Sequence, residues 1–392
     1  MKPLRPQSAP RRRALARLAA PGAAALAPAV VRVSAAALAP ALARAQPREP
    51  RVVEVATGLE HPWSLAFLPD GAMLVTERPG RLRRVSPAGA LSAPIAGVPA
   101  VRAFQQGGLL DVALSPAFAR DRTVFLSFAE PVGIASARTA VARAELVGDT
   151  LRDVRVIFRQ KPEVIGGLHF GSRLVFARDG TLFATLGERF TERAKAQDLS
   201  THLGKIVRIG TDGSVPPDNP FVRTPGALPE IWSYGHRNVQ GAALHPQTGV
   251  LWAHEHGPQG GDEVNVVRAG GNYGWPVVTF GREYVTGTAI GEGTAKPGME
   301  PPLWHWTPSI APSGMAFCTT DRYPGWQGCL LAGALKFMLL ARLVLDGERV
   351  VREERLLTNL GQRVRDVREG PDGTLWLLTD APDGRLLKLV PA

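Results

Sequence analysis

The sequence predicts an all-β protein, a six-bladed β-propeller with four-stranded antiparallel blades and long loops on one face. Three observations lead to this fold class. A strand–turn–strand pattern recurs along the 392-residue chain, 42 glycines and 34 prolines are present, and no convincing amphipathic helix interrupts the pattern. Glycine and proline suit the turns between short strands, and a unit repeated at intervals of tens of residues is typical of a propeller. A β-sandwich of similar length would not explain the repetition.

The recurring unit is an alternating apolar stretch, a turn rich in Asp, Gly or Pro, and a second alternating stretch. The first copy reads HPWSLAFLPDGAMLVTERPGRLRRV, and the third, GGLHFGSRLVFARDGTLFATLGE, turns at Arg178-Asp179-Gly180. Six copies are recognised, at residues 61–85, 107–128, 166–188, 241–267, 313–345 and 364–390. Longer stretches at about 189–228 and 277–308 interrupt the repeat, and we expect them to be loops on one face, where function is commonly built.

The first 45 residues differ from the rest of the chain. They hold eight basic residues and no acidic one, with an Arg11-Arg12-Arg13 run, a long Ala/Leu/Val/Pro tract and a small-x-small sequence ending at Ala45. This pattern indicates an export signal of Sec or twin-arginine type, cleaved near residue 45, although a disordered Ala-rich leader is the alternative. Prolines and an arginine inside the tract argue against a stable membrane span. We therefore expect a signal peptide at 1–45, one propeller domain at 46–392, and a periplasmic or secreted protein.

The net charge of +11 comes mostly from that N-terminal segment. Without it, 38 basic residues face 35 acidic ones, and they are scattered along the chain. A nucleic-acid groove needs a clustered basic stripe with stacking aromatic residues, so no nucleic-acid partner is expected.

Two cysteines are present, Cys318 and Cys329. An exported protein could join them in a disulfide across a hairpin loop, or leave both as buried thiols, and the sequence leaves both alternatives open. Their spacing fits neither thiol catalysis nor a structural zinc site.

Several units carry a polar side chain directly before their first strand. A purely structural repeat would place the same residue type there, but these positions hold an amide, an imidazole, an Arg-Asn pair and two guanidinium groups. Loops at one mouth of a propeller converge on one site, and guanidinium groups pair bidentately with carboxylates, so the set favours a polyanionic ligand. The residues are Gln106, His169, Arg237, Asn238, Arg363 and Arg365.

A second dense stretch is HEHGPQGGDEVNVV, residues 254–267. Its two histidines resemble a metal-binding pair, but no third ligand is spaced to support zinc or iron, so we expect packing or hydrogen-bonding roles. The acidic and Gly/Pro-rich part better suits calcium, which takes carboxylate and main-chain oxygens in irregular loops; a solvated acidic turn is the alternative. The candidate ligands are Gly257, Pro258, Asp262 and Glu263.

The chain resembles the soluble periplasmic sugar dehydrogenases that depend on pyrroloquinoline quinone (PQQ), most closely their aldose sugar dehydrogenase branch. The resemblance covers about residues 52–391 and rests on ordered motifs: HPWSLAFLPDG, QGGLLDVALSP, HFGSRLVF, AQDLSTHLGKIVRI, PPDNPF, EIWSYGHRN, EHGPQGGDEVN, GGNYGWP, SGMAF, GALK and GQRVRDVREGPDG.

The resemblance implies a role for each candidate. His169 would be the general base that takes the proton of the anomeric hydroxyl, while the C1 hydride passes to PQQ, the sugar becomes a lactone, and an external acceptor later receives the electrons. Arg237 would stabilise charge on the quinone oxygen. A calcium ion would lie beside PQQ, and a second would be structural. By the same resemblance, Gln106 would lie near cofactor and sugar, and the PQQ carboxylates and quinone oxygens would be held by Arg237, Asn238, Lys336, Arg363 and Arg365. The carbonyls of Gly257 and Pro258 would bind the first calcium ion. Glu263 and the Tyr273 carbonyl, with Asp262 nearby, would bind the second.

The chain departs from the family pattern at two positions. Leu168 stands where glucose-specific relatives have an acid that helps hold the sugar, so we expect broader sugar scope. Arg189 stands where relatives tend to have an amide, and its guanidinium is expected either to bind a carboxylate or to point to solvent.

Two other functions fit a propeller of this kind: a calcium-dependent lactonase, which needs carboxylates clustered at the channel, and a non-catalytic binding module, which needs no base. The sequence leaves open the sugar, the electron acceptor, and whether the protein is a monomer or a homodimer.

Overall fold

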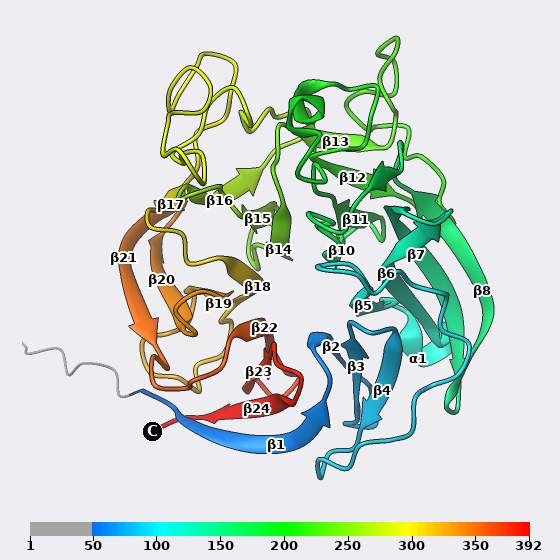
Figure 1. Ribbon diagram of the computed structural model, residues 1–392. Helices are drawn as coiled ribbons and strands as arrows, with labels where there is room; N and C mark the ends of the chain where they lie inside the picture. The colour runs from blue at the N-terminus through cyan, green and yellow to red at the C-terminus, as the bar shows by residue number, and fades with distance from the viewer. Residues whose placement is uncertain (1–48) are drawn as a thin grey trace, which may run out of the picture. The chain divides into compact units, whose positions relative to one another are not determined.

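The protein is described here by a computed structural model that covers residues 49–392; the expected signal peptide at 1–45 lies outside the described residues. Residues 49–392 belong to one compact unit. Within residues 49–392, six antiparallel sheets are arranged in a ring (Figure 1). This confirms the six-bladed β-propeller.

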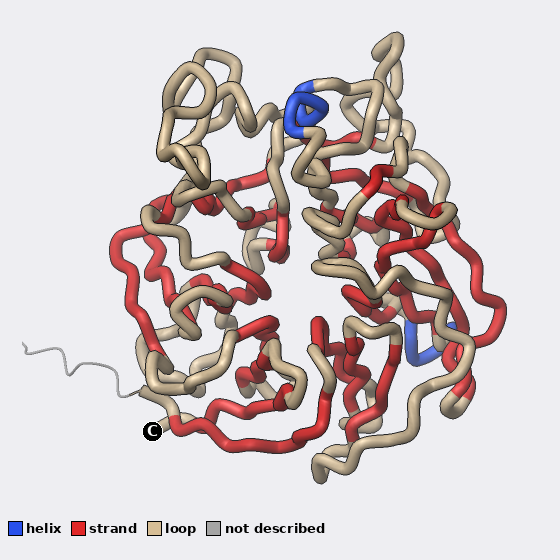
Figure 2. Tube along the Cα trace, viewed as in Figure 1, coloured by secondary structure: helices blue, strands red, loops and turns tan. Residues whose placement is uncertain are grey.

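We number the sheets as blades 1 to 6 in chain order. Blade 1 contains β2 (Pro62–Phe67), β3 (Met73–Glu77) and β4 (Arg81–Val85), and blade 2 contains β5 (Leu109–Leu114), β6 (Thr123–Val132), β7 (Ser136–Val147), β8 (Thr150–Arg159) and β9 (Val164–Ile165). Blade 3 contains β10 (Leu174–Phe176), β11 (Leu182–Thr185), β12 (Lys205–Ile209) and β13 (Ile231–Tyr234), and blade 4 contains β14 (Val239–Leu244), β15 (Leu251–Glu255), β16 (Asp262–Val267) and β17 (Trp304–Trp306). Blade 5 contains β18 (Pro312–Phe317), β19 (Leu330–Ala334), β20 (Leu340–Asp346) and β21 (Arg349–Leu356), and blade 6 contains β22 (Val364–Glu369), β23 (Leu375–Thr379), β24 (Gly384–Val390) and β1 (Arg51–Leu59). Within residues 49–392 two short helices, α1 (Phe118–Asp121) and the 3-10 helix η1 (Arg193–Gln197), lie between strands (Figure 2).

Four blades have the expected four strands, but blade 1 has three and blade 2 has five. After β4 the chain leaves blade 1, and Ala96 forms a bridge to Thr150 at the start of β8. Residues 86–108 include Pro94 and Pro99, which cannot donate to a strand ladder, so no fourth strand forms there. The fifth strand of blade 2, β9, adds a short pairing to β7.

Blade 6 is built from both ends of the described chain. Its strand β1 pairs with β24, with Arg51 opposite Val390 (Figure 1). This pairing closes the ring and leaves no gap between the first and last blades.

Neighbouring blades are joined by a repeated hydrogen bond. In blades 1, 2 and 3 a hydroxyl on the second strand donates to a main-chain carbonyl at the start of the next blade: Thr76 to Leu110, Ser127 to Ser172 and Thr185 to Val239. In blade 4 the imidazole of His254 takes this place and contacts the carbonyl of Gly314 at 3.3 Å. The expected hydrogen-bonding role of His254 is therefore confirmed.

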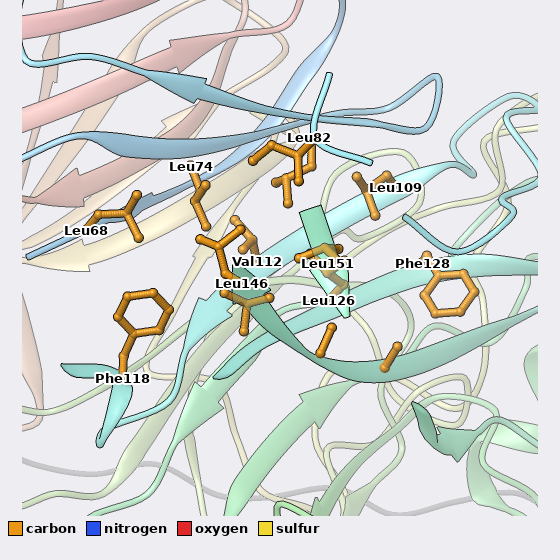
Figure 3. Packing of buried hydrophobic residues seen from close by; sticks show 14 of the residues in the cluster. Leu68, Leu74, Leu82, Leu109, Val112, Phe118, Leu126, Phe128, Leu146 and Leu151 are labelled. Atoms are coloured by element: carbon orange, nitrogen blue, oxygen red, sulfur yellow. The ribbon is translucent and has the colours of Figure 1, made fainter. Parts of the chain in front are cut away.

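Apolar side chains fill the space between blades. Figure 3 shows the largest such cluster, where Leu74 and Leu82 of blade 1 pack against Leu109, Leu126 and other residues of blade 2. Apolar contacts therefore fill most of the space between these two blades at close-packed density.

Four charged side chains connect blades 2, 3 and 6. Arg173 of blade 3, 1% exposed, lies 3.1 Å from Asp111 of blade 2 and 3.2 Å from Asp366 of blade 6. Arg368 contacts the same two carboxylates at 3.1 and 2.8 Å. Buried charges are tolerated when each is paired, and this network links blades that lie far apart in sequence.

Two details differ from or resolve the sequence-based expectations. The stretches at about 189–228 and 277–308 were expected to be loops, but each contains a strand. The first contains β12, which pairs with β11 and supplies the third strand of blade 3, and the second contains β17, which pairs with β16 and ends blade 4. For β12 the reason is burial. All five residues of β12, KIVRI including Lys205 and Arg208, are buried, so the strand shows no apolar–polar alternation that periodicity could detect.

Cys318 and Cys329 are both buried free thiols. Among the described residues no helix is long and apolar enough to cross a membrane.

Candidate active site

A cavity of about 580 Å³ lies where the loops before the first strands of several blades meet. Four cationic side chains line it, Arg78, Lys336, Arg363 and Arg365, together with the carboxylate of Asp380. Of the predicted residues, Gln106, Lys336, Arg363 and Arg365 line this cavity directly, whereas His169, Arg237 and Asn238 lie in the adjoining wall. The remaining lining residues, which sequence reasoning did not select, include His61, Trp63, Phe170, Gln240 and His256.

The cationic side of the cavity carries an excess of positive charge. Asp380 is 2.7 Å from Arg365 and 3.3 Å from Arg363, and it also contacts the His61 imidazole at 2.9 Å. Arg365 and the other positive neighbours hold the pKa of this buried carboxyl well below its usual range, even though burial opposes them. One carboxylate thus balances several cations, and the surplus favours an anionic ligand.

His169 is held in a single orientation. The residue is 5% exposed, its main-chain N–H donates to Gln106 Oε1 at 2.8 Å, and its φ of 51° lies in the left-handed region. Its ring Nδ1 lies 2.7 Å from Glu188 Oε2, and no hydrogen-bond partner for Nε2 is found in residues 49–392. The carboxylate fixes the tautomer with the proton on Nδ1, so Nε2 is the nitrogen able to accept a proton.

The surroundings of His169 keep its ring neutral. Burial lowers the pKa of the imidazole below its ordinary value, and the positive charges of Arg237 and Arg189 lower it further, whereas Glu188 raises it. A neutral imidazole is the form that acts as a general base.

Glu188, which contacts the His169 ring, is a site residue that the sequence analysis did not select. Glu188 follows β11. The glycine before it, Gly187, allows this part of the chain to approach His169 closely, because a Cβ at residue 187 would lie 2.2 Å from the carbonyl oxygen of His169. A signal was present: an acidic residue also stands at or just after the end of the second strand in blades 1, 4 and 6, namely Glu77, Glu255 and Asp380. Only the three-dimensional structure shows which of these carboxylates meets which histidine.

Arg237 and Asn238 lead into β14 behind His169. Arg237, 3% exposed, donates through Nη1 to the carbonyls of His256 and Gly257, at 3.0 and 2.7 Å, and through Nη2 to the Tyr284 hydroxyl at 3.1 Å. Asn238 Oδ1 accepts from Gly171 N at 3.1 Å, and its buried Nδ2 has no partner within the described part of the chain. A buried donor without a partner is a group that a ligand or water would satisfy.

A second, smaller cavity of about 10 Å³, enough for one water-sized particle, lies beyond Arg237. Its lining includes Glu255, Gly257, Glu263 and Tyr273, and His256 borders both cavities. Burial raises the pKa of Glu263 well above its ordinary value, and the neighbouring Glu255 carboxylate raises it further. Two buried carboxylates side by side repel each other, so a cation between them would stabilise both.

The predicted calcium ligands separate into two groups. Glu263 and Tyr273 border the small cavity, but Asp262, its neighbour on β16, points to the other face of the strand. Asp262 accepts from the main-chain N–H groups of Gly257, Ile310 and Ala311, at 2.8–2.9 Å, and from Ser309. Its carboxylate therefore braces two loops. In residues 49–392 no three His, Cys, Asp or Glu side chains are grouped to hold a metal, so a cation here would also need main-chain oxygens.

A model of the Glucose / Sorbosone dehydrogenase family matches residues 59–388. The chain belongs to this family. Its relatives include the aldose sugar dehydrogenase YliI of Escherichia coli, which is 48% identical over 352 residues, covering 88% of this chain and 94% of the relative.

Solved structures of the glucose/sorbosone dehydrogenase family agree with the fold. A crystal structure of glucose dehydrogenase is 52% identical with a TM-score of 0.85, and it covers 88% of this chain and 100% of that one. The PQQ-bound form of the aldose sugar dehydrogenase from Streptomyces coelicolor is 32% identical with a TM-score of 0.71, covering 88% of this chain and 99% of that one. The protein is thus an oxidoreductase of this family, and a relative with the same architecture binds PQQ.

Proposed function

We propose that the protein is a PQQ-dependent aldose sugar dehydrogenase that oxidises its substrate at the anomeric carbon. One observation carries the proposal: a cationic cavity adjoins a histidine whose Nδ1 is held by a buried carboxylate and whose Nε2 has no protein partner in the described residues. An anionic cofactor and a sugar proton therefore have complementary groups within one site. The PQQ-bound relative from Streptomyces coelicolor supports the choice of cofactor.

The residues of the cavity fit PQQ, which carries three carboxylates. Lys336, Arg363 and Arg365 supply positive charge, and the unpartnered Nδ2 of Asn238 supplies a buried donor. A volume of about 580 Å³ falls within the usual range for cofactor pockets. Arg78, which the sequence did not single out, adds a fourth cation, and burial lowers its pKa.

The proposed mechanism uses the protein for orientation and proton transfer. When bound, PQQ supplies the two-electron acceptor for the hydride that leaves the anomeric carbon. His169 Nε2 accepts the proton from the anomeric hydroxyl, so that the sugar becomes a lactone. Glu188 then stabilises the imidazolium that forms, because its carboxylate lies 2.7 Å from Nδ1. Gln106 and the buried wall fix the His169 main chain and ring, which removes the entropic cost of finding the productive orientation.

Calcium is part of the proposal. The carbonyls of Gly257 and Pro258 would serve one ion beside the cofactor, and Glu263 with the Tyr273 carbonyl would serve a structural one. The small cavity between the buried carboxylates of Glu255 and Glu263 supports a cation at the second position. We assign Asp262 to bracing of the loops rather than to direct ligation, because hydrogen-bond donors already surround its oxygens.

The lactonase alternative finds less support in the cavity. It requires several carboxylates at the channel mouth, but the lining contains the single carboxylate of Asp380, which is already paired with arginine. The binding-module alternative has no use for a histidine oriented by a buried carboxylate.

The decisive experiment is reconstitution of the purified protein with PQQ and calcium, followed by reduction of an artificial electron acceptor with glucose and other aldoses. We expect sugar-dependent reduction and retained PQQ absorbance. A His169→Ala variant should retain PQQ and lose most turnover, by roughly 10²- to 10⁴-fold. His245→Ala, in the β14–β15 turn away from the cavity, is the matched control and should keep activity. Absence of both bound PQQ and sugar-dependent reduction would overturn the proposal.

We further propose that residues 1–45 direct export and that the enzyme acts in the periplasm or outside the cell with an external electron acceptor. The basic start, apolar tract and small-x-small sequence support this. N-terminal sequencing of the exported protein tests it: a mature chain that begins near residue 46 is expected, and retention of the full segment in the cytoplasm would contradict it.

A further inference from the structure

Arg189 follows the carboxylate that orients the proposed base, and it is almost fully buried, with 2% exposure. Each nitrogen of its guanidinium donates to a different main-chain carbonyl. Nε reaches Leu168 O at 2.8 Å, Nη2 reaches Gly166 O at 2.9 Å, and Nη1 reaches Ala137 O on β7 at 2.7 Å. The same group lies over the Phe170 ring, 3.8 Å from its centroid.

This placement matches neither sequence-based expectation for Arg189. The guanidinium forms no ion pair with a carboxylate in residues 49–392, and it does not reach solvent. Burial lowers its pKa to about 10, which still leaves it charged at neutral pH. A buried charge whose partners are three carbonyls is retained because its planar fork matches their geometry.

The three carbonyls that Arg189 contacts lie on the segment before His169 and on β7. Gly166 and Leu168 belong to the segment that leads directly into His169, and Ala137 anchors that segment to blade 2. His169 itself adopts a left-handed φ of 51°, a conformation that a non-glycine residue keeps only when its surroundings hold it there. Phe190, the next residue, packs its ring edge-on to the His169 ring at 5.3 Å.

The charge of Arg189 also acts on the His169 ring. The other titratable groups that face this imidazole are Glu188, Arg237 and His256. Arg189 adds a positive charge that disfavours the imidazolium, in the same direction as Arg237 and opposite to Glu188.

We propose that Arg189 is a positioning residue: its three-way contact with the 166–168 segment and β7 sets where His169 Nε2 lies. This inference rests on the proposed function of His169 as the base.

The test compares Arg189→Lys and Arg189→Gln with Arg342→Gln. Arg342 is the matched control, since it is also buried, donates to a main-chain carbonyl and lies over an aromatic ring, but on blade 5. For each variant we would measure the melting temperature, kcat and KM of the PQQ-loaded enzyme, and the His169 pKa by NMR of ring-labelled histidine in the apo-protein.

Both Arg189 variants should lower kcat about ten- to a hundredfold with KM little changed, because a base displaced by about 1 Å loses activity on this scale. Arg189→Gln should also raise the His169 pKa by about half a unit, whereas Arg189→Lys, which keeps the charge, should leave it near the wild-type value. Arg342→Gln should lower the melting temperature without changing kcat or the His169 pKa.

Two results would overturn the inference: wild-type kcat and His169 pKa in both Arg189 variants, or a lower melting temperature with kcat unchanged, as for Arg342→Gln. If Arg189→Gln fails to fold, Arg189→Lys decides, since wild-type kcat in that variant refutes the positioning role. If the wild-type protein oxidises no sugar, the proposed function fails, and the NMR measurement still tests the effect of Arg189 on His169.

Discussion

Replacement of Glu188 by glutamine tests the proton-transfer part of the mechanism. Glutamine keeps the size of the side chain and an oxygen near His169 Nδ1, but it removes the negative charge 2.7 Å from the ring. A hydrogen bond to a charged group contributes about 1.5–3 kcal/mol and a neutral one about 0.5–1.5 kcal/mol, so the imidazolium loses about 1.3 kcal/mol of stabilisation, the difference between the two midpoints. That difference corresponds to about tenfold in kcat and about one pKa unit.

The direction of the pH effect follows from the role of each group. Glu188 raises the pKa of His169, so its removal lowers that pKa further below the ordinary value. His169 must be neutral to accept a proton, and activity is lost as the pH falls through its pKa. The acid limb of the kcat profile should therefore move to lower pH by about one unit, while the plateau falls about tenfold.

The assay is kcat against pH for the PQQ-loaded enzyme with saturating aldose and artificial acceptor. Glu230→Gln is the matched control, because Glu230 lies 3.4 Å from His202 in a histidine–carboxylate pair that does not line the cavity. It should leave both plateau and acid limb unchanged. An acid limb that stays in place or moves to higher pH in Glu188→Gln, or an unchanged plateau, would refute the assignment of Glu188 and His169 as a catalytic pair.

Three further predictions concern the core, the cofactor and the thiols. Asp111→Asn should reduce the free energy of unfolding by about 3 kcal/mol, because the buried Arg173 loses a charged partner at 3.1 Å; urea unfolding measures this, and a loss below about 1 kcal/mol would contradict it. Arg365→Ala should weaken PQQ binding about ten- to a hundredfold, since it removes a charge-assisted contact to a carboxylate; an unchanged Kd in a PQQ titration would exclude that contact. Cys318 and Cys329 should resist a thiol reagent in the native protein and both react after unfolding, because both are buried and burial raises the pKa of Cys318 to about 12. Rapid labelling of the native protein would show that the thiols are accessible.

Much of the fold could be read from local pattern. Alternation of apolar residues and Asp-Gly turns depend on neighbours along the chain, and they identified six units that the structure confirms as blades. The strand β12 was missed because it is buried on both faces and shows no alternation. The three-stranded blade 1 and the five-stranded blade 2 were missed because the number of strands depends on which blade the connecting segments pair with. The segment after β4 pairs with blade 2 instead of adding a strand to blade 1, and β9 adds a strand to blade 2.

The candidate site was partly predictable for the same reason. Gln106 and Arg363 stand just before the first strands of blades 2 and 6, and a repeat brings equivalent positions to the same mouth of the ring. Arg365, expected before the first strand of its unit, is instead the second residue of β22 and still lines the cavity. Asp262 and Glu263 are adjacent in sequence and looked equivalent as ligands, but strand alternation sends them to opposite faces. Only the packed structure separates a carboxylate that borders a cavity from one that braces loops.

The sequence by itself determined the repeat, the turns and the residue types that converge on one mouth, because these follow from short-range periodicity and its symmetry. The tertiary structure alone decided the partners: Glu188 for the His169 ring, three carbonyls for Arg189, and Asp111 with Asp366 for Arg173. Such contacts join residues on different strands or blades, and burial then determines their strength. No local pattern encodes those distances, which is why the orientation of His169 emerges only when the ring closes.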